Sequence, residues 1–141
     1  MIALDTNLLV YAADSRSAHH ARAREAVTDV VESPAWALPW SVVHEYLKVV
    51  TDPRTGGVSM DTALSSVEAY LGAPGVRPLA EPVGYWTELR PLLVASGVTG
   101  SRIFDARIAA TCLAHGVREL WTADRDFSRF PGLRTRNPLV G

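Results

Sequence analysis

The sequence predicts an α/β fold with three layers, in which helices cover both faces of a central parallel sheet of four to five strands. Short apolar runs alternate with segments of helical periodicity along the whole chain. Such apolar runs are typical of strands buried on both faces of a parallel sheet. The length of 141 residues is enough for one continuous core and too short for two ordinary ones, so we expect a single domain spanning residues 1–141.

The first half of the chain is expected to contain two strands and four helices. In order, they are a strand at 2–4, helices at 8–13 and 19–31, a strand at 36–38, and helices at 42–50 and 60–71. The first strand ends where the polar Asp5 begins a turn, and Pro34 ends the second helix. Ser41 is the expected N-cap of the helix that follows the second strand.

The second half continues the alternation of strands and helices. Its expected elements are a strand at 76–79, helices at 83–95 and 103–115, a strand at 119–122, and a short fifth strand within 133–137. Pro91 is a possible kink inside its helix. Gly116 is expected to end the next helix in the left-handed conformation that favours glycine.

Composition excludes several classes of protein. The one cysteine, Cys112, cannot form an internal disulfide, and no cysteines and histidines have the spacing of a zinc site. The first apolar stretch carries Asp5 and Asp14 and lacks a basic leader, which argues against a signal peptide. No apolar run reaches membrane-spanning length. We therefore expect a cytoplasmic protein with no membrane association.

Charge is unevenly distributed along the chain, although the net charge is only −1. Residues 1–100 hold seven basic and eleven acidic side chains, whereas residues 101–141 hold seven basic and four acidic. Thirteen of the fourteen basic residues are arginine, which suits bidentate phosphate contacts. Arginine-favouring codons in a GC-rich genome would explain most of them equally well.

Acidic residues lie where ligands bind in parallel α/β sheets, which is at the carboxyl ends of the strands. Asp5 directly follows the first strand, and Asp124 lies two residues after the strand predicted at 119–122. Glu45 is one turn into the helix after the second strand. Asp105 lies in the first turn of the helix before the fourth strand. Four carboxylates from distant parts of the sequence are thus expected at one edge of the sheet.

Each acid alone has an ordinary structural explanation, as a helix cap, a turn residue or a solvent-facing side chain. Together they indicate a cation site, because like charges in one cleft repel and raise one another's pKa unless a cation holds them. Oxygen ligands without histidine or thiol favour Mg²⁺ or Mn²⁺. Such ions also bind a substrate phosphate, so the pattern indicates a phosphodiester-cleaving site.

Four short motifs resemble the signature regions of PIN domains, most closely those of the VapC toxins of bacterial toxin–antitoxin pairs. They are LDTN at 4–7, HEYLKV at 44–49, FDARIAA at 104–110 and TADRDF at 122–127. The resemblance runs from residue 2 almost to the end of the chain. It implies a PIN-like α/β/α fold and endoribonuclease activity dependent on Mg²⁺, with Mn²⁺ as a possible substitute. It also implies an RNA substrate, a cognate antitoxin and a homodimer.

The resemblance carries metal ligation and catalysis onto particular side chains. These are Asp5, Glu45, Asp105 and Asp124, with Asp126 as a further acid whose share in metal binding varies among family members. Thr6, Asn7 and Thr122 are candidates to orient the carboxylates or bound waters. Arg125 either contacts the substrate backbone or balances charge at the surface. In the implied mechanism a metal-activated water attacks phosphorus in line.

Two other functions were weighed. An aspartyl-phosphate enzyme would also place an aspartate after the first strand, but it needs a lysine after a late strand, and Lys48 is the only lysine. A catalytically inactive PIN-like module that binds RNA or protein stays open as the alternative, although all four acids are present. Trp36 and Trp121 are expected in the core, whereas Trp40 and Trp86 are candidates for a protein interface.

Overall fold

A five-stranded, fully parallel sheet forms the centre of the molecule. The computed structural model describes residues 1–140. Its strands are β1 (Ile2–Leu4), β2 (Trp36–Pro39), β3 (Val76–Leu79), β4 (Glu119–Trp121) and β5 (Arg134–Arg136), in the spatial order β3-β2-β1-β4-β5. The parallel sheet is confirmed, and the optional fifth strand is present as a short edge strand.

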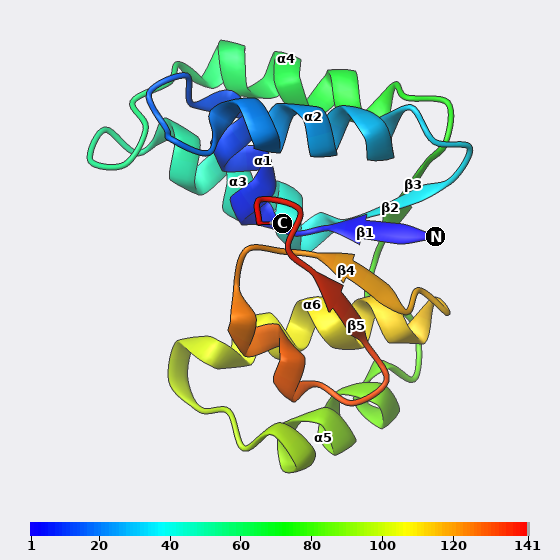
Figure 1. The fold of residues 1–141 in the computed structure, drawn as a ribbon. Helices are drawn as coiled ribbons and strands as arrows, with labels where there is room; N and C mark the ends of the chain where they lie inside the picture. Colours follow the sequence, from blue (N-terminus) through cyan, green and yellow to red (C-terminus); the bar gives the residue numbers. More distant parts are fainter. Residues whose placement is uncertain (141) are drawn as a thin grey trace.

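Helices pack on both sides of this sheet, as the three-layer prediction requires (Figure 1). They are α1 (Thr6–Ala13), α2 (His20–Val31), α3 (Trp40–Thr51), α4 (Met60–Leu71), α5 (Tyr85–Ser96) and α6 (Ile103–Ala114), with two short 3-10 helices, η1 (Gly100–Arg102) and η2 (Arg125–Arg129). Helices α1 to α4 lie on one side, and α5 and α6 lie on the other.

The core lies where the apolar strands meet the inner faces of these helices. Leu4, Trp36 and Leu120 are fully excluded from solvent in the sheet. On α6, Ala109 and Cys112 are also fully buried, and such small side chains permit close approach of the helix to the sheet. Trp36 and Trp121 are both buried, which confirms the prediction that they belong to the core.

Helix boundaries differ from the predictions at a few positions. Ser41 is not an N-cap, because β2 extends to Pro39 and α3 begins directly after it at Trp40. Pro39 is the capping residue in an extended conformation, and it makes no side-chain cap hydrogen bond. Gly116 has the expected left-handed backbone, with a φ of 74°. No helix in the described part of the chain is both long and apolar enough to cross a bilayer.

The strand order creates a point of topological reversal between β1 and β4. The chain runs outward from β1 to β2 and β3 by way of α1 to α4, and then returns past α5 and α6 to β4 on the other side of β1. In open α/β sheets, ligands bind in the crevice outside the carboxyl ends of the strands at such a point. The residues that follow β1 and β4 therefore lie where a ligand is expected to bind.

Candidate active site at the carboxyl edge of the sheet

Asp5 is held at the reversal point by hydrogen bonds from both neighbouring segments. Its backbone N–H donates to the carbonyl of Trp121 at 3.0 Å, which joins it to the end of β4. Its carboxylate accepts from the backbone N–H of Thr6 at 2.7 Å and from the Thr122 hydroxyl at 2.7 Å. Asn7 Nδ2 donates to the same carboxylate at 3.2 Å. The predicted orienting role of Thr6, Asn7 and Thr122 thus agrees with their contacts.

Burial dominates the electrostatics of Asp5, which is only 5% exposed. Loss of hydration raises the pKa of Asp5 to about 6, against the hydrogen bonds from Thr122 and Thr6, which lower it. The negative charges of Glu45 and Asp105 raise the pKa further, but they rank behind burial. Repulsion between the acids, expected from the sequence, therefore contributes to the raised pKa of Asp5, but it contributes less than burial does.

The four acids predicted from the strand ends line one cavity of about 220 Å³. Glu45 projects from α3 and accepts a hydrogen bond from the Thr6 hydroxyl at 3.1 Å, which links it to Asp5 through one residue. Asp105 comes from the first turn of α6, and Asp124 comes from the loop after β4. Four elements distant in sequence thus contribute a carboxylate to the same space.

Asp126 does not line this cavity. It lies in η2, where its carboxylate pairs with Arg102 and lies 3.9 Å from Arg129 Nη2. Arg102 Nη1 is also 3.2 Å from an oxygen of Asp105 and 3.0 Å from an oxygen of Asp124. Asp105, Asp124 and Asp126 are therefore held by one guanidinium, that of Arg102, which was not predicted to contribute to the site.

The residue types fit a hard divalent cation, but two of the four acids, Asp105 and Asp124, contact an arginine in this structure. The side chains predicted to bind the ion all offer carboxylate oxygens. Asp5 is buried, and its carboxylate accepts hydrogen bonds only from neutral groups. Within residues 1–140, no three acidic, histidine or cysteine side chains are grouped closely enough to hold one ion directly. Asp105 and Asp124 instead contact Arg102. Binding of an ion by all four acids would require side-chain movement.

A larger cavity of about 670 Å³ adjoins the acidic one and shares Glu45, Asp105 and Asp124 with it. Its lining also includes Lys48 and Phe104. Lys48 follows Glu45 by three residues on α3, a spacing that places two side chains on the same helix face. That spacing is the sequence signal for Lys48, whose place in this cavity was not predicted.

Three further residues of the larger cavity were not predicted to contribute to the site. His44 contributes to the lining next to Glu45, and Arg102 and Arg107 contribute positive charge. Arg107 is paired with Glu81, which lies in the loop between β3 and α5. Because Arg102 and Arg107 flank Asp105 in the sequence, the start of α6 and its approach contribute both basic and acidic side chains to the lining.

Arg125 lies on the other side of Asp124. It is exposed and lines a cavity of about 290 Å³ together with Thr122, Asp124 and Asn137. The two alternatives for Arg125, substrate contact and charge balance, stay predictions.

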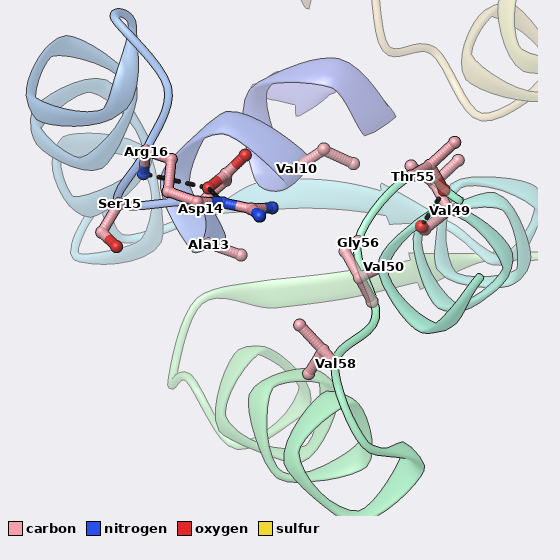
Figure 2. Close-up of a pocket in the computed structure, with 10 residues that line it drawn as sticks. All are labelled: Val10, Ala13, Asp14, Ser15, Arg16, Val49, Val50, Thr55, Gly56 and Val58. Carbon is pink, nitrogen blue, oxygen red and sulfur yellow. Dashed lines mark hydrogen bonds and ion pairs between the residues drawn. The ribbon is translucent and has the colours of Figure 1, made fainter. Parts of the chain in front are cut away.

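A separate hollow of about 210 Å³ lies between the end of α1 and the end of α3 (Figure 2). Val10, Val50 and Val58 give it apolar walls. Its one acid, Asp14, pairs with Arg16 at 3.0 Å, and the hydrogen bonds from Arg16 lower the pKa of Asp14. A lone, paired carboxylate offers no equivalent of the four-acid arrangement, so we place the candidate active site in the cavity around Asp5.

Curated relatives match this chain over nearly its full length. Ribonuclease VapC48 of Mycobacterium tuberculosis is 32% identical over 140 residues, covering 97% of this chain and 97% of its own. Ribonuclease VapC43 of the same organism is 35% identical over 144 residues, covering 100% of this chain and 97% of its own.

Solved structures share the fold at lower sequence identity. The crystal structure of VapC20 from Mycobacterium tuberculosis, described as a sarcin–ricin loop cleaving toxin, aligns with a TM-score of 0.72 at 20% identity and covers 95% of this chain and 99% of its own. VapBC2 from Rickettsia felis, solved with a promoter DNA fragment, aligns with a TM-score of 0.67 at 23% identity. The alignment covers 97% of this chain and 98% of the matched chain. The family model of the PIN domain matches residues 2–133, so the chain belongs to the PIN domain family.

Proposed function

We propose that the protein is a VapC-type endoribonuclease that hydrolyses RNA phosphodiester bonds with the help of Mg²⁺ or Mn²⁺. The observation that carries the proposal is the single cavity lined by Asp5, Glu45, Asp105 and Asp124 at the topological reversal between β1 and β4. The curated relatives, which span the same length, are named ribonucleases, and this supports the RNA substrate.

The four carboxylates would be the ligands of the divalent ion, with Asp126 at the margin of the site. Asp5 is positioned for this role by donors from Thr6 and Thr122, which fix its two oxygens separately. The chemistry that such a bound ion supplies is activation of a water for in-line attack and neutralisation of charge on the phosphate oxygens. Asn7 Nδ2 donates to both the Asp5 carboxylate and the Thr122 hydroxyl, which helps to keep the site in one arrangement.

The adjoining 670 Å³ cavity would receive the RNA next to the acids. Lys48 offers a positive charge for a backbone phosphate. Phe104 is 64% exposed at the same cavity and offers an aromatic face on which an unpaired base would stack. A single-stranded or loop segment suits this arrangement, because its bases are free to leave a stack.

We further propose that a cognate antitoxin inhibits the protein and that the toxin itself is a homodimer. The structural neighbours include a toxin–antitoxin complex from Klebsiella pneumoniae. Trp86 is 62% exposed and Trp40 is 39% exposed, and large exposed aromatic side chains are enriched at protein interfaces.

The nuclease proposal is tested with purified protein, a labelled RNA hairpin and Mn²⁺. We expect cleavage by the wild type and by Asp29→Asn, which makes the same chemical change at an exposed position on α2. Asp5→Asn and Asp105→Asn should each reduce the rate by about two orders of magnitude or more, because a charged ligand is lost. EDTA should abolish cleavage.

Cleavage that persists in EDTA would contradict the metal-dependent mechanism. Equal cleavage by Asp5→Asn and wild type, purified in the same way, would contradict the assignment of the site. RNA binding by the wild type without cleavage in Mg²⁺ or Mn²⁺ would favour the alternative, an inactive PIN-like binding module.

A further inference from the structure

Arg102 bridges three carboxylates that come from two separate segments. Its Nη1 atom lies 3.2 Å from an oxygen of Asp105 and 3.0 Å from an oxygen of Asp124. Its Nη2 atom pairs with Asp126. The fork of the guanidinium allows one side chain to satisfy several carboxylates at once, which an ammonium does less well.

The position of Arg102 in the chain is unfavourable without these partners. It immediately precedes α6, where the positive end of the helix dipole disfavours a cation. The hydrogen bond to Asp105 is the largest of the effects that raise the pKa of Arg102. The charges of Asp124 and Asp126 act in the same direction. The acids therefore account for the placement of this cation at the start of α6.

The carboxylates of the acidic cavity fall into two groups according to their partners. Asp5 and Glu45 contact only neutral donors, and no basic side chain in residues 1–140 forms a salt bridge with either. Asp105 and Asp124 both pair with Arg102. A divalent ion that binds both groups must compete with Arg102 for the oxygens of Asp105 and Asp124.

We propose that Arg102 is an internal counter-cation that occupies the carboxylates of Asp105 and Asp124 and is displaced when the divalent ion binds. This inference rests on the proposed function, because it assumes that the four acids are the ion's ligands. It gives Arg102 a role in setting metal affinity. After displacement, the guanidinium stays at the edge of the 670 Å³ cavity, which Arg102 also lines and in which the RNA backbone is proposed to lie.

The test measures the Kd for Mn²⁺ directly, by electron paramagnetic resonance of the free ion, without RNA. The variants are Arg102→Gln, Arg102→Lys and the matched control Arg129→Gln. Arg129 carries the same charge and approaches only Asp126, at 3.9 Å. We expect about tenfold tighter binding in Arg102→Gln and no more than about twofold in Arg129→Gln. Arg102→Lys should also bind more tightly than wild type, because a lysine keeps the charge and loses the fork.

A second readout follows the guanidinium itself. The Nε–Hε resonance of Arg102, assigned by its loss in Arg102→Lys, should shift during a Mg²⁺ titration with the same Kd as metal binding. A resonance that does not move on saturation with Mg²⁺ would overturn displacement. The proposal would also be overturned if Arg102→Gln bound Mn²⁺ no more tightly than Arg129→Gln, or if Arg102→Lys bound it as weakly as the wild type.

Asp5→Asn separates failure of this proposal from failure of the proposed function. Mn²⁺ binding that is lost in Asp5→Asn but unchanged in Arg102→Gln would leave the metal site standing and remove the role of Arg102. Tighter binding in Arg102→Gln that Asp5→Asn leaves unaffected would support competition by Arg102 and contradict a site shared with Asp5. If neither the wild type nor Arg102→Gln bound Mn²⁺, both proposals would be overturned.

Discussion

At Asp5 the fold buries a carboxylate among neutral donors, and this makes stability depend on pH. Its pKa is raised from 3.8 to about 6, so the folded protein binds this proton more tightly than the unfolded chain does. The resulting stabilisation is fully present below the unfolded pKa and is lost as pH rises through the folded value. Above pH 6 the charged Asp5 therefore opposes folding in the metal-free protein.

Asp5→Asn removes this titration, so the metal-free variant should be at least as stable as the wild type at pH 7.5. The gain is at most about 3 kcal/mol, and the hydrogen bonds from Thr122 and Asn7 that an amide accepts less well reduce it. The difference between the two proteins should shrink at pH 5. Urea unfolding in EDTA at both pH values measures it, with Asp29→Asn as control. A difference that does not change with pH would contradict the buried charge.

Cys112 is fully buried on α6, and burial raises the pKa of its thiol to about 12. Because only the thiolate reacts readily, the native protein should not react with Ellman's reagent at pH 8, whereas the protein in guanidinium chloride should release one equivalent. Rapid reaction of the native protein would show that α6 opens locally. Since α6 carries Asp105, such opening would also loosen the candidate site.

Among the secondary structure elements, the strands were the easiest to predict from sequence. All five were expected at or near their observed positions, although β5 is the exposed segment Arg134–Arg136 and not an apolar run, and the carboxyl-end rule then located Asp5 and Asp124. The start of α3 was mispredicted because Ser41 is a good capping residue by type. The pairing of β2 with β3 continues through Pro39, however, and leaves no room for a turn before Trp40. Such pairing is a tertiary property that local sequence does not contain.

Helix α3 presents Glu45 and Lys48 on one face, so it should contribute to both metal and RNA binding. Lys48→Gln in an Asp5→Asn background should weaken RNA binding several-fold and reduce the slope of log affinity against log salt by about 0.7, the value for one phosphate contact on a single strand. Fluorescence anisotropy at several salt concentrations measures this. Arg22→Gln, an exposed change on α2, is the control. A change in affinity that is equal at every salt concentration would argue against a phosphate contact.

For the whole molecule, the arrangement of the acids was predictable and the arrangement of the cations was not. Residues after the strands and residues near the starts of α3 and α6 lie at the same edge of the parallel sheet, so the meeting of the four acids follows from the fold class. Arg102 meets Asp105 within one helical turn, but Asp124 and Asp126 reach it only because η2 folds back beside η1. No spacing rule connects residues separated by more than twenty positions. That a single domain spans residues 1–141 stays a prediction.

The assembled site should stabilise the whole fold when it binds a cation. At a Mn²⁺ concentration about 100 times its Kd, an ion that binds only the folded state adds roughly 2.7 kcal/mol to the free energy of unfolding. This should raise the Tm of the wild type by several degrees relative to EDTA. Asp5→Asn should lose most of the increase, and Asp29→Asn should keep it. Equal stabilisation of all three proteins by Mn²⁺ would contradict a shared site that includes Asp5.

Sequencing of RNA 5′ ends after brief expression in a bacterial host tests the central claim most directly, because it observes RNA cleavage and its dependence on Asp5 together. Cells that express the wild type should accumulate new ends at discrete positions, and Asp29→Asn should reproduce the same positions. Cells that express Asp5→Asn at the same level should resemble cells without the protein. Identical end profiles for the wild type and Asp5→Asn would contradict the account of this cavity as a ribonuclease active site.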